Sequence, residues 1–163
     1  MLKSIKKLGF EKPTQIQEES IPHVLEGKDV VGESATGSGK TLAFGCGAID
    51  KTTPKQGLQV LILLPTRELA EQVKTAINQL NIGKTLKLVS IYGGVSITPQ
   101  MDALRYSEIA IATPGRLKDH IQRGTIDLSK IKLLILDEAD RMLDMGFVDD
   151  IEDIVKRCPK NRQ

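Results

Sequence analysis

The sequence predicts an α/β fold in which a central, mostly parallel β-sheet carries helices on both faces. Two observations support this class. Nearly continuous apolar runs alternate with helical patterns along the 163 residues, as expected for strands that are covered on both sides. A glycine-rich loop joins the first apolar run to the next helix, which is a strand–loop–helix unit typical of parallel sheets. No internal repeat breaks this order, so we expect one domain over residues 1–163.

The elements follow one another in a regular order. The first is a helical pattern at 14–27, where Thr14 and Gln17 have capping-box spacing, Pro22 interrupts the pattern and Gly27 ends it. Strands are expected at 29–34, 58–65, 86–92, 108–114 and 131–137. The helices between and after them are expected at 40–50, 66–80, 99–105, 115–122 and 148–157.

Composition narrows the class of protein. Hydrophobic residues make up 40% and charged residues 27%, which is the balance of a soluble globular domain. No apolar run approaches a membrane span, and the first ten residues lack the apolar core of a signal peptide. Cys46 and Cys158 have no metal-ligand spacing, so we expect reduced thiols and a cytoplasmic protein. A net charge of +2 does not decide for or against nucleic acid.

The loop at 34–41, "SATGSGKT", predicts a phosphate-binding site. Gly37 and Gly39 let the backbone curl so that its N–H groups point inward, and Lys40 adds a positive charge for phosphates. Thr41 offers a hydroxyl to Mg²⁺, and the helix that follows directs its positive end at the same place. Ser34 takes the place of the first glycine in the general pattern. The expected ATP-binding residues of the loop are Ser34, Ala35, Thr36, Gly37, Ser38, Gly39, Lys40 and Thr41.

A second chemical signal is the acidic end of the run "LLILDEAD" at 133–140. In P-loop proteins a strand-end aspartate holds Mg²⁺, directly or through water, and Asp137 fits that position. Glu138 can orient and deprotonate an attacking water. The plain alternative is that these acids cap a helix. The Lys40–Thr41 loop favours hydrolysis.

Asp137-Glu-Ala-Asp140, following Gly-Ser-Gly-Lys-Thr, resembles the DEAD-box family of ATP-dependent RNA helicases. "GFEKPTQIQ" at 9–17 is similar to the family's adenine-recognising Q motif. Three further segments are similar to its RNA-contacting motifs and occur in the same order: "PTRELA" at 65–70, Gly93-Gly94, and "TPGR" at 113–116. The likeness covers essentially the whole chain.

The resemblance implies an N-terminal RecA-like ATP-binding domain that uses Mg²⁺ with ATP. Phe10 would pack on adenine, and Gln17 would bond its edge with help from the Lys12 backbone. Lys40, Asp137 and Glu138 would be the catalytic residues, and Asp140 would link to a Ser-Ala-Thr motif. That motif and the second RecA-like domain lie beyond Gln163, so we expect a fragment of a longer enzyme. The implied RNA-binding residues are Pro65, Thr66, Arg67, Gly93, Gly94, Thr113, Pro114, Gly115 and Arg116.

These segments also have a physical logic of their own. Thr66 and Thr113 stand between a strand and a helix, at expected N-caps, and Pro114 suits a first helical turn. The N-terminus of a helix attracts phosphate, and Arg67 and Arg116 add forked donors. Such contacts grip the RNA backbone and carry little sequence information. Since aromatic residues make up only 3% of the chain, base stacking is not expected to contribute much.

Two other function classes remain open at this point. One is a GTPase or small-molecule kinase, although no N-K-x-D guanine motif occurs and Glu138 favours water over a bound acceptor. The other is a module that binds nucleotide or RNA without turnover. His23 and His120 are interpreted as neither ligand nor base. The acids Asp149, Asp150, Glu152 and Asp153 are interpreted as a solvated helix face.

Overall fold

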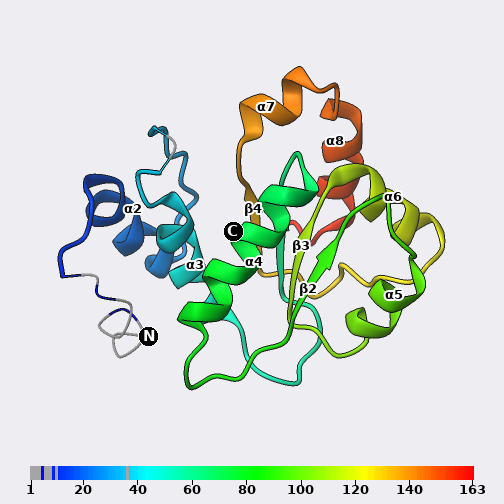
Figure 1. Ribbon diagram of the computed structural model, residues 1–163, viewed down its shortest axis with the longest axis horizontal. Coiled ribbons are helices and arrows are strands. Elements are labelled where there is room, and N and C mark those ends of the chain that lie inside the picture. Colours follow the sequence, from blue (N-terminus) through cyan, green and yellow to red (C-terminus); the bar gives the residue numbers. More distant parts are fainter. Residues whose placement is uncertain (1–4, 6–8, 10, 36) are drawn as a thin grey trace.

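A computed structural model describes residues 5, 9, 11–35 and 37–163, and its centre is a parallel sheet (Figure 1). In the described part of the chain the sheet has four strands in the order β2-β3-β1-β4. Every neighbouring pair is parallel, as the alternating pattern predicted. The strands are β1 Val60–Leu63, β2 Leu88–Ile91, β3 Ile109–Ala112 and β4 Leu133–Leu136.

The helices begin and end close to the predicted positions. Thr14 and Gln17 form the predicted capping box, and Gly27 ends the first helix in the left-handed conformation. Thr66 caps the helix that begins at Arg67, and Pro114 is the first residue of the helix that ends at Gln122. The described helices are α2 Gln15–Glu26, α3 Lys40–Lys51, α4 Arg67–Leu80, α5 Thr98–Leu104, α6 Pro114–Gln122, α7 Ala139–Asp144 and α8 Val148–Arg157.

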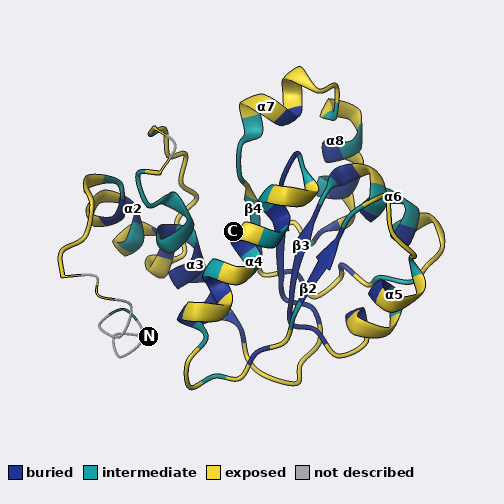
Figure 2. Ribbon diagram, in the orientation of Figure 1, coloured by how far each residue is buried: buried dark blue, intermediate teal, exposed yellow. Residues whose placement is uncertain are grey.

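Alternate side chains of the central strand feed two separate cores. Val60 and Ile62 pack with α3 and α4 on one face, whereas Leu61 and Leu63 pack with α6, α7 and α8 on the other. All four side chains are fully buried, and burial is concentrated where the helices meet the strands (Figure 2). Helices therefore cover both faces of the sheet, which confirms the predicted class.

Helices α2 and α3 lie side by side because Gly47 has no side chain. A Cβ atom at Gly47 would overlap Cγ1 of Val24 on α2. The two helices form the part of the molecule at the left of Figure 1. The helix that carries Gln17 is thereby fixed against the helix that follows the glycine-rich loop.

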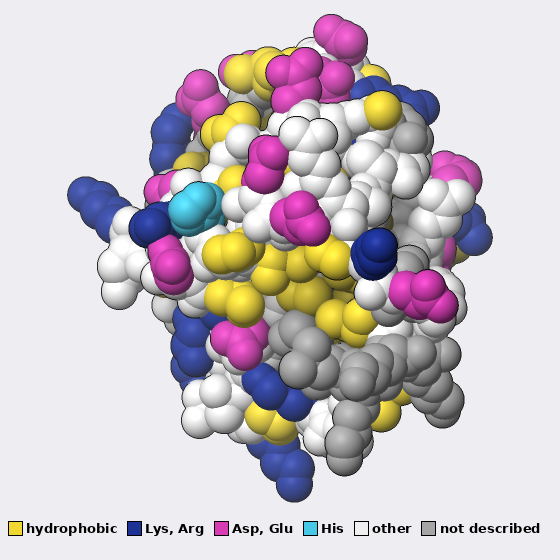
Figure 3. Space-filling view, turned by 90° about the vertical axis from the view of Figure 1, so that its left-hand side faces the viewer, with side chains coloured by type: hydrophobic (Ala, Val, Ile, Leu, Met, Phe, Trp, Pro, Cys, Tyr) yellow, Lys and Arg dark blue, Asp and Glu magenta, His cyan; other side chains and the backbone are white. Residues whose placement is uncertain are grey.

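The predicted strand at 29–34 is wrong for the described structure, because this segment pairs with no strand there. Val31 is fully exposed, and Leu136 at the end of β4 is 41% exposed. Gln163 bonds both the β4 region and the end of α2. Its backbone N–H donates to Lys132 O and its C=O accepts from Leu134 N, both at 2.9 Å. Its side chain donates to the carbonyls of Val24 and Lys28. Figure 3 shows hydrophobic side chains gathered across the middle of the face seen from the left of Figure 1. An apolar run predicts an extended segment, but a strand also requires a neighbour that completes its hydrogen bonds.

Two smaller differences concern helices. Pro22 was expected to interrupt the first helical pattern, but α2 continues through it. Proline removes only one hydrogen bond from the helix, and the packing of Val24 and Ser20 keeps the following turn in place. Helix α7 was not predicted, since six residues with Met142 as the buried one give no helical periodicity.

Within the described residues, no helix has the length and apolar character needed to cross a bilayer. Cys46 and Cys158 are free and buried, and burial raises the pKa of both thiols.

The centre of β1 should dominate stability. Leu61→Ala should lower the free energy of unfolding by about 2–5 kcal/mol, because a fully buried leucine leaves a cavity when truncated. Urea denaturation followed by circular dichroism measures this. Leu143→Ala, at an exposed site on α7, is the control and should change stability by less than about 0.5 kcal/mol. Similar losses in both variants would contradict a close-packed sheet centre.

Candidate functional site

The register of the sheet brings the predicted site segments to one edge. Ile91, Ala112, Leu63 and Leu136 lie in one row across the four strands. The loops that leave this row lead to Gly93-Gly94, to Thr113, to Thr66 and to Asp137. Parallel strands place all their carboxyl ends on the same side, which is where ligands bind in open α/β sheets.

The glycine-rich loop directly precedes α3. Gly37 and Gly39 have φ values of +81° and +95°, a region that side chains rarely adopt. Nζ of Lys40 donates to the Ser34 carbonyl inside the loop, and the hydroxyls of Ser34 and Ser38 lie 2.7 Å apart. Ala35 is exposed, and Thr36 lies outside the described residues. The loop therefore forms a turn with its lysine folded over it.

Gln17 ties the start of α2 to this loop. Its Oε1 accepts from the Thr14 N–H at 3.1 Å, and its Nε2 donates to the Gly39 carbonyl at 3.1 Å. The Thr14 hydroxyl adds a bond to the Ser38 carbonyl at 2.8 Å. Because both ends of the buried amide already have partners, Gln17 acts in this structure as a latch between α2 and the loop.

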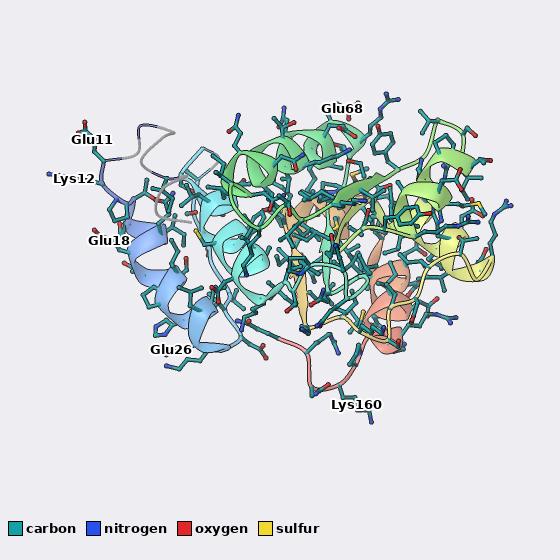
Figure 4. The ribbon with its side chains drawn as sticks, turned by 90° about the horizontal axis from the view of Figure 1, so that it is seen from below. Glu11, Lys12, Glu18, Glu26, Glu68 and Lys160 are labelled. Atoms are coloured by element: carbon teal, nitrogen blue, oxygen red, sulfur yellow. The ribbon has the colours of Figure 1, made fainter. Side chains whose placement is uncertain are left out.

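Two further residues, Lys12 and Phe10, were expected near adenine. The Lys12 side chain is exposed and points away from the body of the molecule in Figure 4, as does the neighbouring Glu11. This placement leaves only its backbone for the role expected of it. Phe10 lies outside the described residues.

Asp137 and Glu138 follow β4 at the carboxyl edge. Burial raises the pKa of Asp137, and the negative charge of Glu138 raises it further. A hydrogen bond from the Glu138 N–H at 3.1 Å and the positive charge of Lys40 act in the opposite direction. The glycine-rich loop leads into α3, which packs against β4, so the two sequence signals lie on neighbouring elements.

Glu138 has a strained backbone. Its φ of +55° and ψ of +44° are left-handed values, and Glu138 is the residue that precedes the first turn of α7. A non-glycine residue in this region costs about 1–3 kcal/mol and is often found at functional sites. This backbone conformation ends the extended course of β4 and turns the chain into α7.

The oxygen donors in this site fit Mg²⁺. Thr41 lies in the first turn of α3, and Asp137 supplies a carboxylate. Among the residues that the structure describes, no three His, Cys, Asp or Glu side chains form a cluster that could hold a metal. Magnesium commonly takes only one or two protein oxygens and completes its shell with water and phosphate, so a hydroxyl and a carboxylate suffice.

The first predicted RNA motif caps α4. Oγ1 of Thr66 accepts from the Leu69 N–H at 3.3 Å, as predicted, and Pro65 is buried beneath it. Arg67 is exposed and lies over the ring of Tyr92, 4.9 Å from its centre. Glu68 follows in the first turn of α4, on the side that Figure 4 shows at the top. Sequence reasoning missed Tyr92, although a scarce aromatic residue directly before Gly93-Gly94 was a usable signal.

The third motif opens α6. Thr113 occupies the N-cap position without a side-chain cap bond, Pro114 is buried and Gly115 is exposed. The Arg116 side chain is only 15% exposed. Its guanidinium donates to the Val95 carbonyl at 3.0 Å and lies 3.8 Å from Asp119. Arg116 therefore braces the loop after Gly93-Gly94 in this structure, whereas Arg67 is exposed over the Tyr92 ring.

The remaining predicted residues have simple surroundings. Asp140 is exposed, and its carboxylate accepts from the Arg141 N–H at 2.9 Å. His23 is exposed 3.9 Å from Glu26. Asp149, Glu152 and Asp153 on α8 are exposed, as expected, whereas Asp150 is half-buried. Lys118 on α6 pairs with Asp150 at 2.7 Å and with Asp153 at 3.4 Å. His120 is fully buried and bonds two neighbouring side chains.

Comparison with known proteins decides the family. The family model described as "DEAD/DEAH box helicase" matches residues 14–163. The chain belongs to the DEAD/DEAH box helicase family.

Relatives within this family are similar over the whole chain. "ATP-dependent RNA helicase CshA" of Limosilactobacillus reuteri is 48% identical over 165 residues, which is 100% of this chain and 33% of the relative. "Probable ATP-dependent RNA helicase MJ0669" of Methanocaldococcus jannaschii is 46% identical and is matched over 45% of its length. The chain thus spans a third to a half of these relatives.

Solved structures agree with the fold. The crystal structure of a DEAD box protein from the hyperthermophile Methanococcus jannaschii has a TM-score of 0.97 at 47% identity, covering 99% of this chain and 45% of the other. A hypothetical ATP-dependent RNA helicase from Sulfolobus tokodaii has a TM-score of 0.90 at 39% identity, with 99% and 47% covered. The RecA-like fold of this DEAD-box chain is therefore confirmed.

The raised pKa of Asp137 predicts that its ionised carboxylate lowers the stability of the folded chain at neutral pH. Its carboxyl is harder to ionise in the folded chain than in the unfolded chain, so the ionised form opposes folding at neutral pH. Asp137→Asn should raise the free energy of unfolding at pH 7. This advantage should shrink as the pH falls through the folded pKa and vanish below about pH 4, where both states are protonated. Denaturant unfolding across this pH range measures it.

Asp140→Asn is the matched control, since the Asp140 side chain is exposed on the next turn. It should leave the pH profile of unfolding close to that of the unchanged chain. Destabilisation by Asp137→Asn at pH 7 would contradict the assigned electrostatics.

Proposed function

We propose that this chain is the N-terminal, ATP-binding half of an ATP-dependent RNA helicase, whose RNA-stimulated ATP hydrolysis drives local duplex unwinding or remodelling of RNA–protein particles. The observation that carries the proposal is that α3, which begins at Lys40, packs against β4, the strand that leads into Asp137 and Glu138 at the carboxyl edge. A P-loop lysine next to paired carboxylates matches the parts needed for in-line attack of water on a γ-phosphate.

Each residue of the site has a role in this proposal. The backbone N–H groups at 34–41 cradle the phosphates, and Lys40 neutralises their charge. Thr41 and Asp137 would hold Mg²⁺, which supplies further charge stabilisation when bound. Glu138 orients and deprotonates the attacking water, and its left-handed backbone sets the direction of its carboxylate. Asp140 remains the proposed link to a Ser-Ala-Thr motif elsewhere in the protein.

The proposed adenine site is on the α2 side of the loop. Phe10 would pack on the base, and the Lys12 backbone and Gln17 would bond its edge. Since Gln17 already bonds Gly39, recognition of the base would exchange that bond for one to adenine. This exchange would couple the recognition of adenine directly to the phosphate-binding loop.

The proposed RNA surface consists of the three loops at the same edge. Pro65–Arg67, Gly93-Gly94 and Thr113–Arg116 offer backbone N–H groups, helix N-termini and the exposed Arg67 guanidinium. Such groups bind phosphate oxygens with little regard for sequence. The relatives named as RNA helicases support RNA as the polymer. A second RecA-like domain of the same protein would complete the groove and supply arginine fingers. The chain alone should therefore bind ATP with little turnover. We also propose a cytoplasmic location.

ATP selectivity tests the nucleotide site. Gln17→Ala should weaken ATP binding by roughly 5- to 100-fold, equivalent to about 1–3 kcal/mol for buried polar groups left unpaired. The ratio of ATP to GTP affinity should fall, because only adenine matches the amide of Gln17. Titration with a fluorescent ATP analogue, in competition with ATP or GTP, measures both quantities. Gln15→Ala is the control, since Gln15 is exposed two residues away and its side chain donates to Glu19. Equal ATP and GTP affinities in the unchanged chain would rule out the adenine site.

Salt dependence tests the RNA surface. Arg67→Ala should weaken binding of the full-length protein to single-stranded RNA by similar factors for different sequences. It should also reduce the slope of log K against log salt by about 0.7, the value for one lost phosphate contact on a single strand. Arg105→Ala removes another exposed positive charge, which lies 3.9 Å from Asp102, and should leave the slope unchanged. An altered sequence preference with an unchanged slope would contradict the phosphate contact.

A further inference from the structure

A buried glutamine connects two of the proposed RNA loops. Gln100 on α5 is only 7% exposed, and its Nε2 donates to the Tyr92 carbonyl at 3.1 Å. Tyr92 directly precedes Gly93-Gly94. At the other end of the same amide, Oε1 lies 3.3 Å from Nε2 of His120 on α6. One side chain therefore spans the space between the glycine loop and the helix that starts with Thr113.

The direction of these bonds fixes the state of His120. Because Nε2 of Gln100 donates to Tyr92, its Oε1 must accept, so Nε2 of His120 must carry a proton. Burial lowers the pKa of His120, with the positive charge of Arg116 adding to the effect and Asp119 opposing it. Nδ1 of His120 lies 2.8 Å from the Thr125 hydroxyl oxygen, which also lies 3.1 Å from the His120 carbonyl. The single hydroxyl proton can go to only one of these two acceptors, so the directions are fixed at the Gln100 end of the network.

Two further contacts hold the same loop from its sides. Arg116 donates to the Val95 carbonyl at 3.0 Å, and Arg67 stacks on the Tyr92 ring. The segment 92–97 thus contacts residues of three helices: Arg67 on α4 through the ring of Tyr92, and Arg116 on α6 and Gln100 on α5 through hydrogen bonds. Gly94 has a φ of +79°, and a Cβ on either glycine would meet nothing within 4 Å. The glycines face open space while the chain beneath them is fixed.

A purely structural role does not account for this arrangement. An apolar side chain of similar volume would fill the space under α5 without the demand for a matched donor and acceptor at each end. A buried polar chain adds directional constraint, and the constraint here acts on the two loops that offer free N–H groups to a ligand. Gln59 provides the contrast, since it is equally buried but bonds Thr53, Gly57 and Lys132 at the opposite edge of the sheet.

We propose that Gln100 and His120 are positioning residues that hold Gly93-Gly94 at a fixed separation from Thr113–Arg116, so that the two loops bind successive phosphates of one RNA strand. Neither side chain contacts RNA. The inference rests on the proposed RNA function, because the fixed separation has its use in a polymer with a regular phosphate spacing.

The test compares Gln100→Ala, His120→Phe, the double variant and the control Gln59→Ala in the 163-residue chain. Uniform ¹⁵N labelling gives amide spectra of Gly93, Gly94 and Gly115, and titration with a uridine decamer gives RNA affinity even where it is weak. ADP titration serves as the second ligand. Gln100→Ala and His120→Phe should each shift the Gly93 and Gly94 resonances and weaken RNA binding by about 3- to 10-fold, the effect of one or two ordinary hydrogen bonds. ADP affinity should not change.

The double variant separates positioning from general destabilisation. Because both residues act through one chain of bonds, it should bind RNA no more weakly than the worse single variant. Gln59→Ala should lower stability but leave the glycine resonances and RNA affinity unchanged. Wild-type RNA affinity in Gln100→Ala would overturn the inference.

Failure of the proposed function has a different signature. If the unchanged chain and the full-length protein both fail to bind RNA, RNA is the wrong ligand and the assigned use of the spacing is overturned with it. Glycine resonances that still shift in Gln100→Ala would then show that the bracing of the loop itself is real. Unshifted resonances would overturn the bracing as well.

Discussion

The arrangement of the site depends on the hydrogen-bonded ladder around β1. This strand pairs with β3 on one side and β4 on the other, and Leu63 lies in register with both Ala112 and Leu136. The ladder leaves no freedom in where Thr66, Thr113 and Asp137 emerge, since each follows the shared row by one to three residues. Burial of β1 on both faces makes a slip of register costly, because it would turn every core side chain to the wrong face.

Local sequence predicted most of this framework because its elements are specified by nearby residues. Apolar runs gave the four paired strands, and caps such as Thr14, Thr66 and Pro114 gave helix starts within a residue or two. The segment 29–34 could not be assigned correctly, because pairing depends on a neighbour that its own residues do not specify. Pro22 shows the reverse case, in which tertiary packing holds a helix through a local breaker.

The residues of the site divide in the same way, into those that local sequence predicts and those that depend on contacts between elements. The P-loop and the Asp137–Asp140 segment have fixed spacings, so the sequence predicted them, and the structure added that α3 packs against β4. The engagement of Arg116 with Val95, and of Gln100 with Tyr92, joins residues from different elements. Periodicity carries no information on such contacts, and a lone Gln or His in a helical pattern looks like any other buried polar residue.

The latch formed by Gln17 has a thermodynamic consequence. Its amide joins the Thr14 N–H to the Gly39 carbonyl, so the start of α2 and the glycine loop cannot move independently while it is closed. In the proposed function, a base that takes over the amide releases Gly39, and a loop that rearranges around phosphates releases the amide. Linkage makes this reciprocal: whatever free energy the base contributes to opening the loop, the phosphates contribute equally to base binding. A base and a triphosphate supplied as separate molecules would then bind cooperatively, with the latch as the coupling between them.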